Sequence, residues 1–334
     1  MFAHHGRCSR RSFLFGAAAF SCTARASQSY LDAKALYLVL APSNLGLRPE
    51  PGGMEPGTWQ APAALMAAGL QHIVQARSVV QLPRPPYETR EQGGTRIRNG
   101  RTLREFSLTL ARSVRTVLGA GGFPLVIGGD CSILLGCLYG LRLAGGQGLI
   151  HIDGHSDFYH PGNYDTSHRL GSAAGMDLAL ATGRGETLLT HWPGLDGPLA
   201  SDEHTLQLGE RYALAPGFAY ADIQQTGIRR FTAQEILREG VERTAQGVIE
   251  YVKARGLRRA WMHVDLDVLD QTVMPAVDSP GSPGLTFSQL SSLLSLLFQS
   301  GCVAGADIAI YDPTRDAHDR YAAPIVAALK GAFT

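Results

Sequence analysis

At the centre of the chain, an apolar run leads into a polar motif, and together they read Gly148-Leu149-Ile150-His151-Ile152-Asp153-Gly154-His155-Ser156-Asp157. The apolar part is typical of the end of a buried strand. Because alternate residues of a strand face the same side, Asp153, His155 and Asp157 are expected to share one face where the strand ends.

A second stretch repeats this design and reads Ala260-Trp261-Met262-His263-Val264-Asp265-Leu266-Asp267. Four carboxylates and an imidazole cannot converge in a core unless a positive charge neutralises them. Carboxylates combined with histidine suit divalent ions of the manganese type, so the two stretches predict a site for one or two such ions. The alternative is that these side chains are strand-end caps and surface residues.

Composition limits the possible classes of protein. The chain has 334 residues, of which 45% are hydrophobic and 18% charged, which is sufficient for one α/β domain with a large core. The net charge is +1, and the sequence contains no basic block or acidic tail. This charge pattern argues against nucleic acid and anionic membrane surfaces as partners and favours a small molecule.

The first 26 residues resemble an export signal. The twin arginines of Ser9-Arg10-Arg11-Ser12-Phe13-Leu14 precede the apolar run Phe15–Phe20 and the small-residue cleavage site Ala24-Arg25-Ala26. This order predicts a twin-arginine-type signal peptide at residues 1–26, a periplasmic location, and a single domain at 27–334. The apolar run is too short for a stable membrane span. An ordinary basic start before a short helix is the alternative, whereas a lipoprotein anchor at Cys22 is disfavoured by the residues before it.

The rest of the chain alternates between strand and helix patterns. Strands are predicted at residues 36–40, 78–81, 123–127, 148–152, 206–214, 226–231, 260–264 and 303–310. Helices are predicted at residues 61–68, 102–118, 133–143, 173–181, 241–255, 286–298 and 321–330, and a further helix is expected after the Thr232 cap with its Glu235. Such alternation predicts a mostly parallel sheet covered on both faces, with the ligand site beyond the carboxyl ends of the strands.

Three blocks of the sequence resemble the ureohydrolase family, which comprises arginases, agmatinases and formiminoglutamases. They are Gly128-Gly129-Asp130-Cys131-Ser132, the motif Asp153–Asp157, and Asp265-Leu266-Asp267-Val268-Leu269-Asp270. The resemblance extends from about residue 36 to the end of the chain. It implies a three-layer αβα sandwich around a mostly parallel sheet of about eight strands, a homotrimer or hexamer, and hydrolysis of guanidino or formimino C–N bonds with two manganese ions.

The resemblance also implies roles for individual residues. Asp153 and Asp265 would bridge two metal ions, Asp157 and the residue at Cys131 would complete one site, and His155 and Asp267 would complete the other. A hydroxide held between the ions would be the nucleophile, and Asp157 would transfer its proton to the leaving amine. His168 falls near the family's proton-shuttling histidine. Asn163, His168 and Asp312 are the candidate substrate-binding residues.

The chain departs from the family at two positions. Cys131 stands where the family has a metal-ligating histidine. A thiolate there would favour zinc, iron or nickel over manganese, whereas a neutral cysteine would leave the first metal weakly held or absent. Ile310 stands where the family has the glutamate that pairs with a guanidinium, and Asp312 and Glu210 are the candidate substitutes for it. This loss argues against free arginine and favours a neutral amidine, amide or ureido substrate.

Three functions are therefore compatible with the sequence. The first is a metal-dependent hydrolase of a C–N bond in a small guanidino-, formimino- or amide-like compound. The second is a non-catalytic member of the family that binds a metal or a small molecule. The third is a hydrolase with Cys131 as the nucleophile and His155 or His168 as the base, which would leave the carboxylates unexplained.

Overall fold

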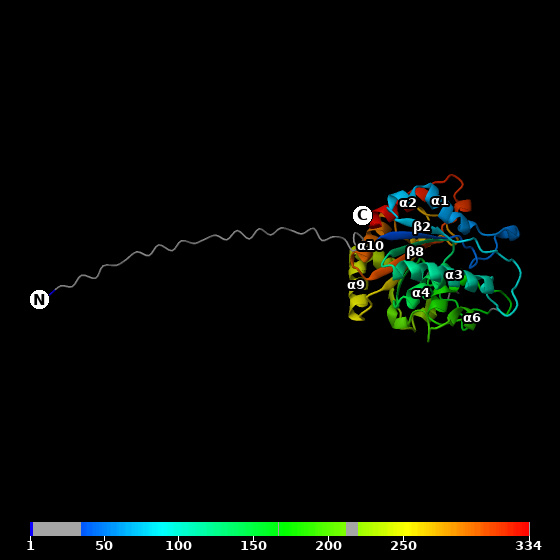
Figure 1. The fold of residues 1–334 in the computed structure, drawn as a ribbon, viewed down its shortest axis with the longest axis horizontal. Coiled ribbons are helices and arrows are strands. Elements are labelled where there is room, and N and C mark those ends of the chain that lie inside the picture. The colour runs from blue at the N-terminus through cyan, green and yellow to red at the C-terminus, as the bar shows by residue number, and fades with distance from the viewer. Residues whose placement is uncertain (3–34, 166, 212–219, 334) are drawn as a thin grey trace.

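The computed structural model describes residues 1–2, 35–165, 167–211 and 220–333 (Figure 1). Its eight strands form one sheet in the order β2-β1-β3-β8-β7-β4-β5-β6, and all the strand pairings are parallel. The strands are β1 (Leu36–Ala41), β2 (Ser78–Gln81), β3 (Phe123–Gly128), β4 (Gly148–Ile152), β5 (Thr205–Leu208), β6 (Arg229–Phe231), β7 (Ala260–Asp265) and β8 (Val303–Ala309). The predicted parallel α/β sheet is thus confirmed.

Helices cover both faces of this sheet. They are α1 (Ala61–Ala67), α2 (Leu70–Ile73), α3 (Gly100–Gly119), α4 (Ile133–Leu143), α5 (Asp177–Ala181), α6 (Thr187–Thr190), α7 (Tyr220–Ile223), α8 (Ala233–Glu239), α9 (Val241–Ala254), α10 (Phe287–Gln299) and α11 (Ala322–Phe333). Helices α3 and α4 pack together in one layer, and α9, α10 and α11 in the other. Crossovers between parallel strands are right-handed, so connections that run in opposite directions across the sheet place their helices on opposite faces. The result is the predicted three-layer sandwich.

Several predicted elements are shorter than expected, among them β6, which begins at Arg229 rather than at residue 226. Strand β5 ends at Leu208, because Gly209 has a φ of 99° and takes the backbone out of the extended region. Glu210 and Arg211 therefore follow the strand, and residues 212–214 of the prediction lie outside the described residues. The helix predicted at 173–181 begins as a 3-10 turn, Ala173–Met176, and becomes α-helical only at Asp177.

The sequence motifs lie at one edge of the sheet. The block containing Cys131 follows β3, the block containing Asp153 follows β4, and Asp265 is the last residue of β7. Strands β3, β4, β7 and β8 are buried along their whole length. Because parallel strands end at the same edge, the motifs meet above the core, where ligands bind in sheets of this kind.

The N-terminal prediction is not addressed by this structure. Residues 3–26 of the predicted signal peptide lie outside the described residues. Within the described part of the chain, no helix is both long enough and apolar enough to cross a membrane.

Helices α8 and α10 each begin with a capping box, and the predicted one at Thr232 and Glu235 is confirmed. In α10 the Thr286 hydroxyl accepts a hydrogen bond from the Gln289 N–H, and the Gln289 side chain accepts one from the Thr286 N–H. We expect Thr286→Ala to lower the free energy of unfolding by about 1 kcal/mol. Urea denaturation would measure this loss. Thr286→Ser, which keeps the hydroxyl, should lie close to the parent, and equal losses in both variants would contradict the cap.

Candidate metal centre

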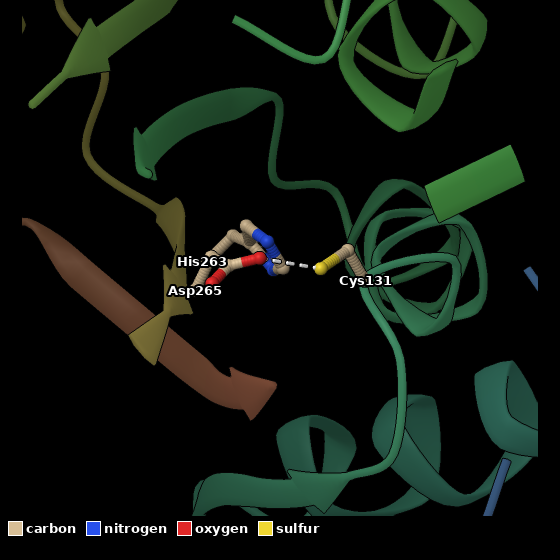
Figure 2. Close-up of side chains that lie close together, drawn as sticks. All are labelled: Cys131, His263 and Asp265. Carbon is tan, nitrogen blue, oxygen red and sulfur yellow. Dashed lines mark hydrogen bonds between the residues drawn. The ribbon is translucent and has the colours of Figure 1, made fainter. Parts of the chain in front are cut away.

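Three loops bring the predicted ligands together above the sheet. In Figure 2, the side chains of Asp265 and His263 face Cys131. Asp265 and His263 lie on β7, and Cys131 lies in the turn that follows β3. The Cys131 Sγ lies 2.7 Å from the Asp265 Oδ2, and these three residues form one group whose ligand atoms are all within 4.8 Å of one another. All three are buried.

A second group contains Asp153, His155 and Asp267, again with ligand atoms within 4.8 Å of one another. The His155 Nδ1 is 2.7 Å from the Asp267 Oδ2 and 3.8 Å from the Asp153 Oδ1. Both carboxylates are buried, whereas His155 is partly exposed. The predicted ligands from two distant parts of the chain are therefore neighbours in space.

The electrostatics of these groups fit bound cations. Burial raises the pKa of Asp153 to about 6, with repulsion from Asp267 adding to the effect. Burial and neighbouring carboxylates also raise the pKa values of Asp157 and Asp265 well above their usual range. The Asp153 Oδ2 is buried and has no hydrogen-bond partner among the described residues. Carboxylates in such surroundings are stabilised as anions by a divalent ion, so the residues present fit a metal centre.

The pKa values of Cys131 and Asp267 are shifted in opposite directions. Burial and then the charge of Asp265 raise the pKa of the Cys131 thiol well above its usual range, so the thiol stays protonated and donates a hydrogen bond to Asp265. Burial alone would raise the pKa of Asp267 too, but His155 and Arg211 outweigh it and lower that pKa to about 2. Without a metal ion, Cys131 is thus a neutral thiol and Asp267 an anion. Metal binding would release the thiol proton.

Arg211 positions the second motif, a role that the sequence did not reveal. Its buried guanidinium donates to the backbone carbonyl oxygens of Asp267, Leu269 (3.1 Å) and Pro283 (3.0 Å). It thereby joins the turn that carries Asp267 to the loop at Pro283. The sequence had predicted only that Arg211 lies within the strand at residues 206–214.

The centre opens into a cavity of about 630 Å³. Five predicted ligands line it, namely Cys131, His155, Asp157, Asp265 and Asp267. Aromatic and charged side chains line the rest, including Phe158, Tyr159, Tyr164, Arg48, Arg169 and Asp278. Asp157 has a φ of 44°, a left-handed conformation that aspartate adopts more readily than most residues. A cavity of this size admits a small molecule.

Not every predicted substrate residue reaches this cavity. Asn163 lines it, but its amide donates to the Phe158 carbonyl oxygen (3.1 Å) and to the Asp222 Oδ2 (2.8 Å). His168 is absent from the cavity wall, because its side chain is 90% exposed and lies 3.8 Å from Asp165. The histidine predicted to shuttle protons is therefore on the surface.

The two acidic candidates for replacing the missing glutamate also lie elsewhere. Asp312 is buried but accepts hydrogen bonds from the Gly57 N–H (3.0 Å) and the Thr314 N–H (2.8 Å), so it holds two turns together. Glu210 is buried in an ion pair with Arg230. Neither carboxylate lines the cavity, because local backbone and side-chain donors already engage them.

Ile310 does line the cavity, next to the end of β8. Its φ is 74°, which is strained for a β-branched residue, and its N–H donates to the Gly129 carbonyl oxygen at 2.7 Å. Two carboxylates that the sequence did not single out, Glu50 and Asp278, also line the cavity. Asp278 comes from the Pro/Gly-rich loop after β7, and partial burial raises its pKa. Its position in a loop left no periodic signal in the sequence.

Fold and site together define an α/β sandwich with a candidate carboxylate–histidine metal centre at the carboxyl ends of its parallel strands. Residues 41–331 match the model of the arginase family, and the chain belongs to that family. It is 32% identical over 248 residues to the arginase of Bacillus caldovelox, which covers 73% of this chain and 79% of that protein.

Solved structures give the same result. The arginase structure from Bacillus caldovelox is 28% identical, covers 90% of this chain and 98% of its own, and superposes with a TM-score of 0.78. The formimidoylglutamase from Bacillus subtilis, at 20% identity and a TM-score of 0.69, covers 96% of this chain and 95% of its own, and shares the fold. The predicted resemblance to ureohydrolases is confirmed, and these relatives support a hydrolase that acts on C–N bonds.

Proposed function

We propose that this protein is a metal-dependent hydrolase of a C–N bond in a small amidine, formimino, ureido or amide compound. The observation that carries the proposal is the convergence of buried carboxylates, His155 and Cys131 on one side of a cavity. The relatives named above support the same chemical class.

Two divalent ions would be held by the residues that the family resemblance implies. Asp153 and Asp265 would lie between them, with Cys131 and Asp157 on one side and His155 and Asp267 on the other. Bound ions of this kind supply a hydroxide nucleophile near neutral pH and balance negative charge that develops on the substrate. Asp157, which lines the cavity, would accept a proton and deliver it to the leaving nitrogen.

The cavity wall favours a head group that carries no permanent charge. Ile310 gives the wall an apolar surface, so a guanidinium beside it would lack the glutamate partner that the family resemblance places there. Arg48 and Arg169, which are both exposed lining residues, would favour an acidic tail on the substrate. We therefore propose an amidine or amide compound that carries a carboxylate as the substrate class.

The test is a substrate panel on metal-stripped protein reloaded separately with manganese, zinc, nickel or iron. We expect release of ammonia or formamide from at least one acidic amidine, formimino or amide compound, and loss of that activity with a chelator. Free arginine should be a poor substrate. Absence of turnover with every ion and every compound would contradict the proposal.

A second candidate is a non-catalytic binding protein. It is favoured because His168, the predicted proton shuttle, lies on the surface. Among the described residues that line the cavity, His155 is the only histidine. Firm binding of a panel compound without turnover would support this function. The cysteine-nucleophile hydrolase is disfavoured, because the Cys131 thiol is buried and burial raises its pKa, which suppresses the reactive thiolate.

Cys131 should set the metal preference of the centre. A soft sulfur ligand favours zinc, nickel or iron, whereas imidazole tolerates manganese as well. In Cys131→His we expect half-maximal activation by manganese at about a tenfold lower concentration, by analogy with the tenfold or greater effects of changes around metal sites. Activity titrations with manganese and zinc would measure the shift. An unchanged preference would mean that Cys131 is no ligand.

A further inference from the structure

A second cluster of metal-ligand side chains lies beneath the cavity floor. It contains His151 on β4, His263 on β7, Asp153, and Asp177 at the start of α5. All four side chains are fully buried, and none lines the cavity. His151, Asp153 and His263 form one group with ligand atoms within 4.8 Å of one another, and Asp177 lies outside that group but contacts both histidines. The family resemblance and the proposed hydrolase use Asp153 but neither histidine, nor Asp177.

The sheet register aligns the two histidines. His151 on β4 is paired with His263 on β7, and His263 is paired with Asp307 on β8. Residues that are paired across strands project from the same face of the sheet. The two imidazole rings are stacked, with centroids 4.9 Å apart and an interplanar angle of 24°.

Several atoms of this cluster make no hydrogen bond, although distances of 3.7 Å join His263 to Asp177 and His151 to Asp153. The His263 Nε2, the Asp153 Oδ2 and the Asp177 Oδ2 are buried, with no hydrogen bond among the described residues. A buried polar atom without a partner is costly, so three of them within one cluster indicate a missing ligand. The two carboxylates and the two imidazoles would together complete the coordination of one cation.

The distances between these atoms are longer than those of good hydrogen bonds and close to the separations of ligand atoms around a tetrahedral ion. The His151 Nε2 is 3.3 Å from the Asp177 Oδ1 and 3.7 Å from the Asp153 Oδ2, and the His263 Nε2 is 3.7 Å from the Asp177 Oδ2. Good N–H···O hydrogen bonds are about 2.7–3.2 Å long. In a regular tetrahedron with bonds of about 2.0–2.2 Å, ligand atoms are separated by about 3.3–3.6 Å.

The Nδ1 atom of His263 faces a carboxylate, as the second ring nitrogen of a metal-bound histidine commonly does. Its Nδ1 lies 2.6 Å from the Asp307 Oδ2, and the Asp307 Oδ1 accepts a hydrogen bond from the Trp261 Nε1 at 2.5 Å. A carboxylate on Nδ1 holds the proton there and leaves the Nε2 lone pair free for a metal. Asp153 faces both sites, since its Oδ1 accepts from the His155 N–H (2.5 Å) while its Oδ2 lies toward His151.

We propose that His151, His263, Asp153 and Asp177 form an inner metal site for one tetrahedral ion of the zinc class. Two imidazoles and two carboxylates suit zinc, and the two negative charges balance the ion in a buried setting. The site shares Asp153 with the cavity centre, and its His263 also lies near Cys131 and Asp265 of that centre, whereas His151 and Asp177 belong to the inner site alone. It goes beyond the proposed hydrolase, because the inner ion would be bound whether or not the cavity is catalytic.

The test is visible spectroscopy of metal-stripped full-length protein reloaded with cobalt, together with elemental analysis after zinc reloading. Tetrahedral cobalt absorbs far more strongly than five- or six-coordinate cobalt. We expect strong visible bands in the wild type, with loss of most of their intensity and of one equivalent of zinc in His151→Gln and Asp177→Asn. His155→Gln, which alters the cavity side, should keep the bands.

Three outcomes would overturn the inner site. They are a wild type without tetrahedral cobalt bands, bands that persist in both His151→Gln and Asp177→Asn, or bands that disappear in His155→Gln. Circular dichroism would establish that each variant is folded. If the inner variants do not fold, X-ray absorption on zinc-loaded Asp265→Asn, whose cavity centre is impaired, decides the question. A first shell of about four N and O atoms at about 2.0–2.2 Å with imidazole scattering supports the site, and any other shell contradicts it.

Discussion

Asp265→Asn is expected to reduce kcat/KM on the substrate found in the panel by about a thousandfold or more. Metal ions stabilise transition-state charge by several kcal/mol, and a loss of about 4 kcal/mol corresponds to that factor. Asp265 contacts both halves of the centre, since its Oδ2 is 2.7 Å from the Cys131 Sγ and its Oδ1 accepts from the Asp267 N–H at 2.6 Å. A neutral amide at this position cannot neutralise two ions.

Asp265→Asn should impair metal binding and turnover but not folding. Burial raises the pKa of Asp265 well above its usual range, so the metal-free protein already favours the uncharged side chain. Because asparagine has nearly the same shape and no charge, the metal-free variant should unfold at the same urea concentration as the parent or higher.

Asp270→Asn is the matched control, because Asp270 belongs to the same sequence block but lies outside the cavity wall and is bonded to Thr272 and Gly284. Its kcat/KM should stay within a few-fold of the parent. If Asp265→Asn kept a tenth or more of the parent activity, the bridging role would be wrong.

Gly129→Ala is expected to be the most damaging substitution for stability, with a loss of about 3 kcal/mol or more in the free energy of unfolding. A Cβ at this position would lie 1.8 Å from the Ser43 carbonyl oxygen and 2.7 Å from the Ser43 N. Both atoms are backbone, so the clash cannot be relieved by a rotamer change. The end of β3 would have to move away from the loop after β1.

This movement would also disturb the site. Asp130 joins the same two segments, since its N–H donates to the Ser43 carbonyl oxygen and its carboxylate accepts from the Ser43 hydroxyl at 2.9 Å. Cys131 follows directly, so its distance to Asp265 depends on this contact. Urea denaturation would measure the stability, and metal content the effect on the centre.

Gly119→Ala is the control for this prediction. It lies at the exposed end of α3, and a Cβ there would meet no atom within 4 Å. Alanine in place of a helical glycine should raise the stability by about 0.5–1 kcal/mol. If Gly129→Ala were as stable as Gly119→Ala, close packing of the β3 turn would not be required.

Much of the fold followed from local patterns. Apolar runs such as residues 123–127 and 260–264 are nearly continuous, because strands β3 and β7 are buried on both faces. Their alternation with amphipathic helices implied parallel strands, and parallel strands must end together. That geometric constraint is why Asp153, His155, Asp265 and Asp267 were predicted to meet from sequence alone.

Residues outside periodic segments were not predictable in this way. His168 is close to the motif in the chain but points to solvent, whereas Asp278, from a distant loop, lines the cavity. Arg211 follows a strand that ends earlier than predicted, and its contacts lie on loops more than fifty residues away. Loop paths depend on non-local packing, which leaves no periodic signal in the sequence.

The sequence by itself determined the parallel α/β architecture, the family and the edge at which the acidic motifs converge, because these depend on strand periodicity and on motif order. The tertiary structure decided which polar side chains lie close together. His151 and His263 occupied the apolar runs that predicted β4 and β7, and nothing local marked them as a pair. They face each other with Asp177 only because the register aligns β4 with β7 and α5 begins above them. Strand register and helix placement are set by packing of the whole core, so a site that depends on both appears only in the folded chain.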